Sequence, residues 1–316
     1  MRRLPYLGIL VVLPLAACAA PGAAPSAGAP SGSPSETFTT RAEAVAAVWP
    51  AVAAATPAWR TGFVPLQDPL IAPAGLSDEQ RQAFDAGWFT LEGSLPTAAG
   101  SGEVAYAAGA EQAPLLSAAD AFALIDRGDP PPCEPGTGKR PGGAPSAPAA
   151  GQPGPDSPVS ADDAACTRLP VTGATLGTVP LRTSRGDATV PAWLFAVRGV
   201  PSPIARVAVA STAPVPSPSL APPSTGADTL KATQSVARVA GTAIDLRLGV
   251  GACDEQITPL VHETETVIVV GGTAVSTAEM CTEQLVIHPA TVTLAAPAGD
   301  RPILDALTGQ VLLLRP

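Results

Sequence analysis

The sequence has few of the side chains that most enzymes use for nucleophilic and acid–base catalysis. Histidine occurs only at His262 and His288, so a Ser-His-Asp or Cys-His arrangement would have to use one of them. Lysine occurs only at Lys139 and Lys231, and neither has a serine three positions before it, which excludes a Ser-x-x-Lys nucleophile. Gly-x-Ser-x-Gly elbows and glycine-rich phosphate loops are also absent. Carboxylates are therefore the main candidates for any catalysis.

Basic and aromatic residues are both scarce. The chain has 18 basic and 27 acidic residues and a formal net charge of −9, which becomes more negative if Arg2 and Arg3 are removed with a signal segment. Nucleic acids and anionic lipid surfaces require clustered positive charge, so we expect neither as a partner. Aromatic residues make up 4% of the chain, and Trp193 alternates with apolar neighbours, which predicts a place in the core.

Five cysteines are present, and four of them follow Cys18. An even number of cysteines in an exported chain predicts disulfide bonds, and four cysteines allow three pairings. We favour sequential pairing, Cys133 with Cys166 and Cys253 with Cys281, because each bond then closes a local loop of roughly 30 residues. A thiolate metal site is disfavoured because no Cys-x-x-Cys pair occurs. We expect no cofactor.

The first residues have the order of a bacterial secretion signal. Arg2 and Arg3 precede an apolar run from Leu4 to Leu15, and two alanines then lead to Cys18. The Leu-Ala-Ala-Cys sequence resembles a lipobox, at which bacteria attach a diacylglyceryl group to the cysteine thiol and cut the preceding peptide bond. The resemblance implies that residues 1–17 are removed. It also implies that Cys18 is lipidated and holds the chain on the outer face of the cell membrane.

Two other interpretations of this segment stay open. Ala16 and Ala17 are small enough for an ordinary signal peptidase, whose cleavage would release the chain from the membrane. A transmembrane helix fits less well, because the apolar run is shorter than the ~20 residues that span hydrocarbon. This run also contains Pro5 and Pro14.

Stretches rich in proline, glycine, alanine and serine divide the rest of the chain. Such stretches have too little apolar bulk to offset the entropy of ordering a backbone, so we expect them to be tethers and linkers. The predicted order is a signal peptide (1–17), a tether (18–35), an α+β domain (36–210) with a disordered insert (134–165), a linker (211–228) and a β domain (229–316). The alternative to a linker at 211–228 is a long loop within one β domain.

Helix signals are few and lie early in the chain. Thr40 with Glu43 matches a capping box for a helix that reaches Trp49 and is interrupted by Pro50. Ser77 with Gln80, and Ser117, predict two further helices: 77–86 and 117–125.

Strand signals dominate from residue 169 onward. Short runs of valine, leucine and isoleucine between turn residues predict strands at 178–183, 189–197, 244–250, 257–262, 266–270, 284–294 and 311–314. The first two flank Ser184-Arg185-Gly186-Asp187, which has the turn chemistry of a hairpin. We therefore predict a β-rich α+β fold. In it, an N-terminal α+β region with a few short helices precedes a small antiparallel β-sandwich or barrel-like domain.

One group of charged residues is the strongest candidate for a site, and it surrounds two predicted strands: Asp254, Glu255, His262, Glu263 and Glu265. These side chains could form a weak metal site, or the centre of a carboxylate- or metal-dependent hydrolase. They could equally be solvent-facing charges on a strand edge or turn. A helical two-histidine zinc site is excluded, because no second histidine follows His262 at the required spacing.

Three stretches, 188–197, 251–263 and 291–309, resemble uncharacterised secreted lipoproteins of high-GC Gram-positive bacteria. The resemblance implies an extracytoplasmic location and no particular activity. Within the last stretch we expect a local ion pair among Asp300, Arg301 and Asp305. The favoured function is a non-catalytic binding or structural module of the cell envelope. It would contact an envelope protein or a wall polymer through an exposed sheet edge or apolar patch.

Overall fold

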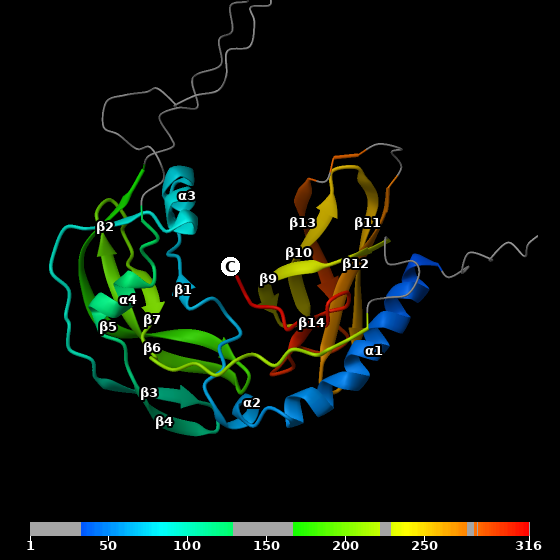
Figure 1. Cartoon of the computed structure of the whole chain (residues 1–316), viewed down its shortest axis with the longest axis horizontal. Helices are drawn as coiled ribbons and strands as arrows, with labels where there is room; N and C mark the ends of the chain where they lie inside the picture. Colours follow the sequence, from blue (N-terminus) through cyan, green and yellow to red (C-terminus); the bar gives the residue numbers. More distant parts are fainter. Residues whose placement is uncertain (1–32, 129–166, 222–228, 277–280, 283, 316) are drawn as a thin grey trace, which may run out of the picture.

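The computed structural model describes residues 33–128, 167–221, 229–276, 281–282 and 284–315. These residues form two lobes that lie side by side (Figure 1). The first lobe is built on a seven-stranded sheet, and the second on a three-stranded and a four-stranded sheet. The fold is therefore β-rich α+β, as the sequence predicted. Cys18, Cys133, Cys166 and the predicted insert at 134–165 lie outside the described residues.

Four helices occur in the described part of the chain: α1 (Pro34–Ala54), α2 (Ala58–Thr61), α3 (Asp78–Ala86) and α4 (Ala118–Ala123). The predicted start of α3 is confirmed, because the Ser77 hydroxyl accepts a hydrogen bond from the Gln80 amide and the Gln80 side chain accepts one from the Ser77 amide. Ser117 likewise caps α4 by accepting from the Asp120 amide.

The prediction for α1 was wrong at both ends. Its capping box is formed by Ser33 and Glu36, and the helix continues through Pro50 to Ala54. A proline inside a helix costs about 3 kcal/mol, which the burial of one helix face offsets here. This face includes Phe38 and Trp49, both almost fully buried.

The strands of the first lobe are β1 (Leu70–Ile71), β2 (Phe89–Leu91), β3 (Ser101–Tyr106), β4 (Gly109–Pro114), β5 (Leu169–Thr183), β6 (Gly186–Val197) and β7 (Ile204–Val207). They follow the order β1-β7-β6-β3-β4, and β5 also pairs with β6 and with β2. The predicted hairpin is the β5–β6 pair, with strands longer than predicted. Gly186 begins β6 at φ 89°, a conformation that favours glycine.

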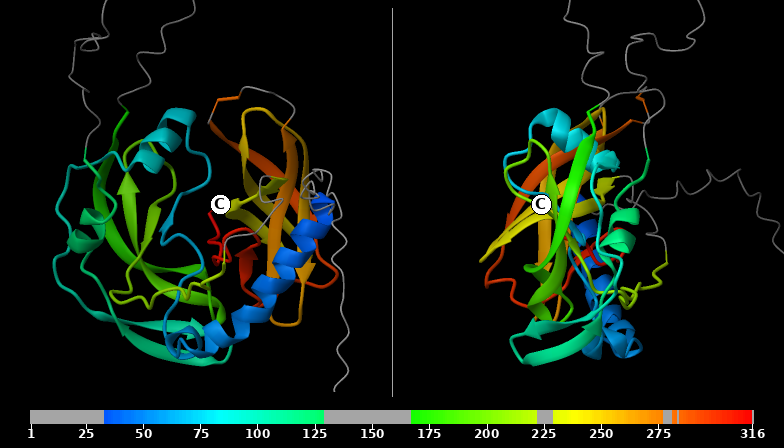
Figure 2. Two further views of the ribbon diagram at one scale, coloured as in Figure 1. Left: turned by 45° about the vertical axis from the view of Figure 1, so that its right-hand side comes forward. Right: turned by 90° about the vertical axis from the view of Figure 1, so that its left-hand side faces the viewer.

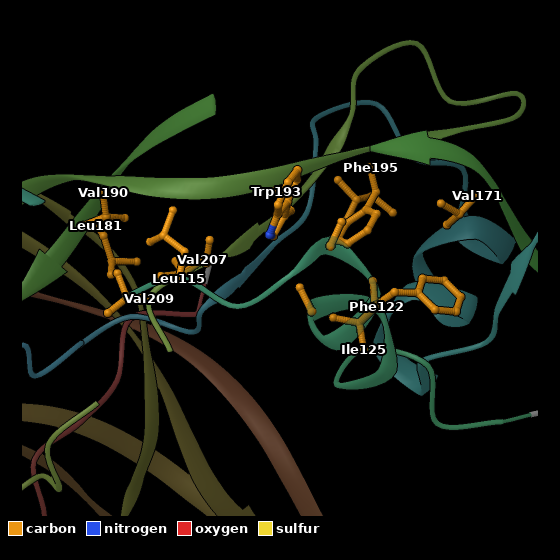
Figure 3. Packing of buried hydrophobic residues seen from close by; sticks show 14 of the residues in the cluster. Leu115, Phe122, Ile125, Val171, Leu181, Val190, Trp193, Phe195, Val207 and Val209 are labelled. Carbon is orange, nitrogen blue, oxygen red and sulfur yellow. The ribbon is translucent and has the colours of Figure 1, made fainter. Parts of the chain in front are cut away.

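The core of the first lobe lies beneath β6 (Figure 3). Phe195 is fully buried and packs edge-to-face with Phe122 of α4, with ring centroids 6.2 Å apart. Trp193 is buried, as the sequence predicted, and its indole N–H donates to the Leu116 carbonyl at 2.9 Å.

The strands of the second lobe are β8 (Leu230–Lys231), β9 (Thr233–Ala240), β10 (Ala243–Gly251), β11 (Asp254–Glu263), β12 (Ile268–Ser276), β13 (Leu285–Thr293) and β14 (Ile303–Asp305). One sheet has the order β13-β10-β9; the other has β11-β12-β14, with β8 also on β12. Side chains from both sheets share one buried cluster, so the lobe is a small sandwich. The β12–β14 pair is parallel, unlike the antiparallel pairs around it.

The predicted strand at 311–314 does not form. This segment makes only isolated bridges, and Leu314 bridges both to Gln67, which lies between α2 and β1, and to Val236 of β9. The end of the described chain therefore lies between the two lobes (Figure 1).

Helix α1 packs on the second lobe, although its sequence precedes the first lobe (Figure 2). Phe38 and Trp49 share a buried cluster with Val269 of β12. Arg41 also donates hydrogen bonds to the Ala306 and Leu307 carbonyls, at 3.1 and 2.8 Å. The sequence placed this helix in a domain of residues 36–210, whereas its buried contacts are with the second lobe. The predicted boundary at 211–228 stays a prediction.

Candidate functional site

Arg301 organises the loop that connects β13 to β14. Its guanidinium group donates to four backbone carbonyls and to the Glu263 carboxylate at 3.2 Å; the carbonyls are those of Thr264, Ala296, Pro297 and Ala298, at 3.0 to 3.2 Å. Such a network fixes the loop, because charged donors make stronger hydrogen bonds than neutral ones. The predicted ion pair among Asp300, Arg301 and Asp305 is wrong, because Arg301 pairs with Glu263 from β11.

Asp305 holds the turn that follows β14. Its side chain accepts hydrogen bonds from the Thr233 amide, the Thr308 amide and the Thr308 hydroxyl, each at 2.7 Å. Asp305 is 1% exposed. Burial raises the pKa of Asp305, and these hydrogen bonds oppose the shift. The Leu-Asp and Thr-Gly pairs at 304–305 and 308–309 therefore have a structural role as parts of one buried turn.

The end of the β5–β6 hairpin docks on the loop that Arg301 holds. Arg182 of β5 donates to the carbonyls of Gly299 and Arg301, at 2.8 and 3.1 Å. Asp300 lies directly over Gly186, where a Cβ atom would approach the Asp300 Oδ1 atom to 2.5 Å. These contacts join the first lobe to the second.

A cleft of about 440 Å³ lies beside this contact. Its polar lining comes from Gln67, Arg182, Asp187 and Asp300, and its apolar lining includes Val239 and Leu314. The Arg182 side chain is 12% exposed and lies 4.0 Å from the carboxylate of Asp187, which is 82% exposed. Burial lowers the pKa of Arg182, while Asp187 and Asp300 oppose that shift. Arg182 is the single cation among the lining residues, so the cleft can offer guanidinium donors to a small hydrogen-bond acceptor.

The five charged residues singled out in the sequence do not come together. Asp254 and Glu263 are the first and last residues of β11, whose ten residues span about 30 Å. Each has its own partner: the Asp254 carboxylate lies 2.7 Å from the Lys231 ammonium group, and Glu263 pairs with Arg301. His262 is half-buried opposite Val269 of β12.

The remaining two, Glu255 and Glu265, are exposed. Within the described ranges, no group of three or more histidine, cysteine, aspartate or glutamate side chains is close enough to hold a metal ion. The arrangement agrees with the interpretation of these residues as separate charges along a strand.

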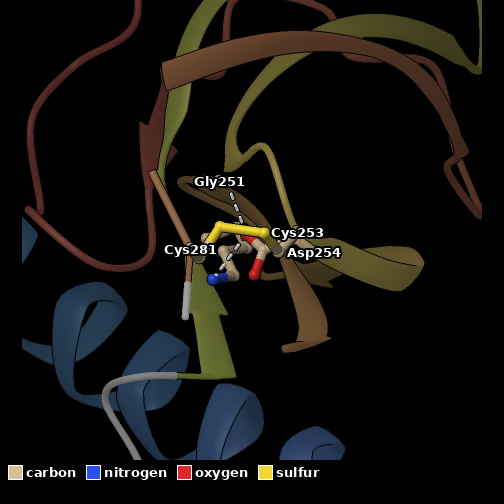
Figure 4. The surroundings of a disulfide bond; sticks show 5 residues. Gly251, Cys253, Asp254 and Cys281 are labelled. Carbon is tan, nitrogen blue, oxygen red and sulfur yellow. Dashed lines mark hydrogen bonds and ion pairs between the residues drawn. A yellow bond between two sulfur atoms is a disulfide. The ribbon is translucent and has the colours of Figure 1, made fainter. Parts of the chain in front are cut away.

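Cys253 and Cys281 form a disulfide bond, with Cα atoms 6.0 Å apart, in agreement with sequential pairing (Figure 4). The bond lies beside the ion pair of Asp254 and Lys231, whose side chains are 5% and 15% exposed. Burial opposes ionisation of Asp254, but hydrogen bonds from Lys231 and the Gly251 amide outweigh it and lower the pKa of Asp254. No pattern in the sequence marks Lys231 of β8, because its partner Asp254 belongs to β11, which comes three strands later along the chain.

The hairpin turn consists of Ser184 and Arg185, because Gly186 and Asp187, also expected in the turn, already belong to β6. Arg185 donates to the Glu111 carboxylate at 2.9 Å, and its guanidinium carbon lies 3.7 Å from the centre of the Tyr106 ring. The Arg185 guanidinium group therefore makes its contacts within the first lobe.

Searches with family models, among curated proteins and among solved structures found no match to this chain. In the part of the chain that the structure describes, no helix is both long and apolar enough to cross a membrane.

Proposed function

We propose that this protein is an extracytoplasmic lipoprotein that binds a partner in the cell envelope and has no catalytic role. The observation that carries the proposal is the Leu-Ala-Ala-Cys sequence ending at Cys18, after two arginines and an apolar run. The resemblance to a lipobox supports a lipid anchor on the outer face of the membrane. Two or more acyl chains give a stable anchor, because each buried methylene contributes about 0.8 kcal/mol.

The position of the first helix is compatible with such an anchor. Helix α1 begins at Pro34, and its capping box includes Ser33. The stretch from Ala19 to Ser33 consists of alanine, proline, glycine and serine, which is typical of a tether between an anchor and a folded body.

The arrangement of the charged residues of β11 favours a binding role over a hydrolytic one. Hydrolysis by paired carboxylates requires two of them on either side of one substrate bond. Here Asp254 and Glu263 lie at opposite ends of the strand, and each is paired with a basic side chain. Their chemistry is that of structural ion pairs.

The anchor is tested by labelling cells with radioactive palmitate and separating membranes from soluble protein. We expect the wild-type chain to carry label and to sediment with membranes. The Cys18→Ser variant should lose the label, and it should be found as a soluble chain or as uncleaved precursor. Ala19→Ser, one residue further on, is the matched control and should behave like the wild type. An unlabelled wild-type chain that is fully soluble would contradict the proposal.

A further inference from the structure

Strand β5 has an incomplete outer edge. On one side it pairs with β6 along its length. On the other side, β2 pairs only with residues 169–171 (Figure 1). The segment around Leu66 lies only against Arg182 and Thr183. Residues 173–181, which we call the open edge, have no strand beside them on this side among the described residues.

The backbone direction along the open edge follows from Arg182. Its carbonyl accepts from the Leu66 amide at 2.8 Å, and its amide donates to the Gln67 side chain at 3.3 Å, so both groups point away from β6. Alternate residues of an antiparallel strand point to the same side, and the β5–β6 register is continuous from Gly173 to Thr183. The backbone groups of Ala174, Leu176 and Thr178 therefore also point away from β6.

No described residue forms a hydrogen bond with these outward groups of Ala174, Leu176 and Thr178. Pro180 occupies the next outward position. Proline has no N–H, but an N–H at this position would point away from β6, so no hydrogen bond between β5 and β6 is lost. The side chains agree with an uncovered edge: Leu176 is 51% exposed, and nothing lies within 4 Å of where a Cβ atom of Gly173 would be.

The chemistry of the open edge favours strand addition. Edge strands are commonly protected by lysine, inward-pointing charges, proline or bulges. A bulge between Val171 and Gly173 lies at one end of the open edge and Pro180 at the other, and residues 173–179 between them contain no proline. Here the stretch from residue 169 to 181 carries no charged side chain. Unpaired amide and carbonyl groups at every second residue are complementary to an extended backbone, which is the basis of peptide recognition by β-augmentation.

A second copy of this chain does not fit the open edge. In two-fold antiparallel pairing centred on Leu176, Arg182 of one copy would lie opposite Pro170 of the other. The outward side of Arg182 is already covered by Leu66, and that of Pro170 by Thr90 of β2. Long strands therefore collide at both ends of the open edge, and only a short segment can enter it.

The chain's own segments outside the described residues are also unsuitable. Between residues 19 and 32, 129 and 166, and 222 and 228, no six consecutive residues are free of both proline and charge. Residues 6–13 are free of both, but they belong to the segment 1–17, which we propose is removed as a signal peptide. Proline removes the amide donors that strand addition needs. The occupant must therefore belong to another polypeptide.

We propose that the open edge binds a short, extended and uncharged segment of another polypeptide, which adds as a strand beside residues 173–181. About seven residues fill the edge, at roughly 3.3 Å per residue. Apolar or β-branched side chains in the segment would cover Leu176. This inference rests on the proposed removal of residues 1–17 but not on the lipid anchor, so it holds whether or not Cys18 is modified.

The test uses a phage library of random heptapeptides, selected against the processed chain, residues 18–316, carrying Cys18→Ser. Enriched peptides are synthesised, and their dissociation constants are measured by calorimetry. Leu176→Pro removes one outward amide without removing a hydrogen bond to β6, and Leu176→Val is its matched control. Hydrogen exchange of the chain with Leu176 intact then reports which amides the peptide protects, so the test does not depend on the proline variant folding.

We expect the proline variant to bind about tenfold more weakly, which corresponds to about 1.4 kcal/mol, and the valine variant to bind within about twofold of the parent chain. The bound peptide should slow exchange at Ala174, Leu176 and Thr178. The proposal is overturned if no peptide is enriched. It is equally overturned if the bound peptides protect other amides and leave these three unchanged.

Discussion

Replacing Arg182 by methionine tests whether one buried side chain stabilises the contact between the two lobes. Methionine keeps most of the apolar stem but removes the donors to Gly299 and Arg301, at 2.8 and 3.1 Å. Hydrogen bonds from charged groups contribute about 1.5 to 3 kcal/mol each, and the adjoining cleft allows water to reach the freed carbonyls. The Arg182 side chain is 12% exposed, so little of this contribution is lost to solvent screening. We expect Arg182→Met to lower the free energy of unfolding by about 3 kcal/mol.

Equilibrium unfolding in urea, followed by tryptophan fluorescence, measures this loss. Arg238→Met is the matched control: Arg238 donates to Asp245 at 2.8 Å, but its side chain is 68% exposed. Exposed pairs contribute about 0 to 1 kcal/mol, so the control should remain close to the wild type. A loss below about 0.5 kcal/mol in Arg182→Met, or equal losses in the two variants, would refute the role of Arg182.

Two further predictions concern the second lobe. Asp305→Asn should destabilise the chain by about 1 to 3 kcal/mol, because both Asp305 oxygens accept hydrogen bonds, from the Thr233 amide and from Thr308, and asparagine keeps only one acceptor oxygen. Since the folded state raises the pKa of Asp305 above 3.8, its contribution is fully present below that pH and declines as pH rises through the folded-state pKa. Urea midpoints from about pH 3.5 to about pH 6 should show the advantage of the wild type over Asp305→Asn decreasing, and an increasing advantage would contradict the assignment. Replacing Cys253 and Cys281 together by alanine should cost roughly 3 kcal/mol, because the bond closes a loop of 28 positions. Unchanged thermal unfolding in that double variant would show that the bond has no stabilising role.

Local signals in the sequence were sufficient to predict several helices and strands. Ser77 and Ser117 cap their helices because a side-chain oxygen reaches an amide three residues further on, which depends on nothing distant. The strand predicted at 244–250 forms because its large apolar residues occur at every second position and therefore lie on one buried sheet face.

The remaining features depend on contacts that sequence spacing does not encode. Helix α1 is extended past Pro50 by packing against β12, more than two hundred residues away. Arg182 and Arg301 bind mainly backbone carbonyls, which every residue carries, so no residue type marked their partners in the sequence. The charged group around β11 was singled out by proximity in sequence, whereas an extended strand places its ends far apart.

The most direct test of the proposed function is the intact mass of the N-terminal peptide from membrane-purified protein. The proposal predicts a chain that begins at Cys18, lacks residues 1–17 and carries a diacylglyceryl group on the cysteine thiol. An unmodified N-terminus downstream of Cys18 would contradict it.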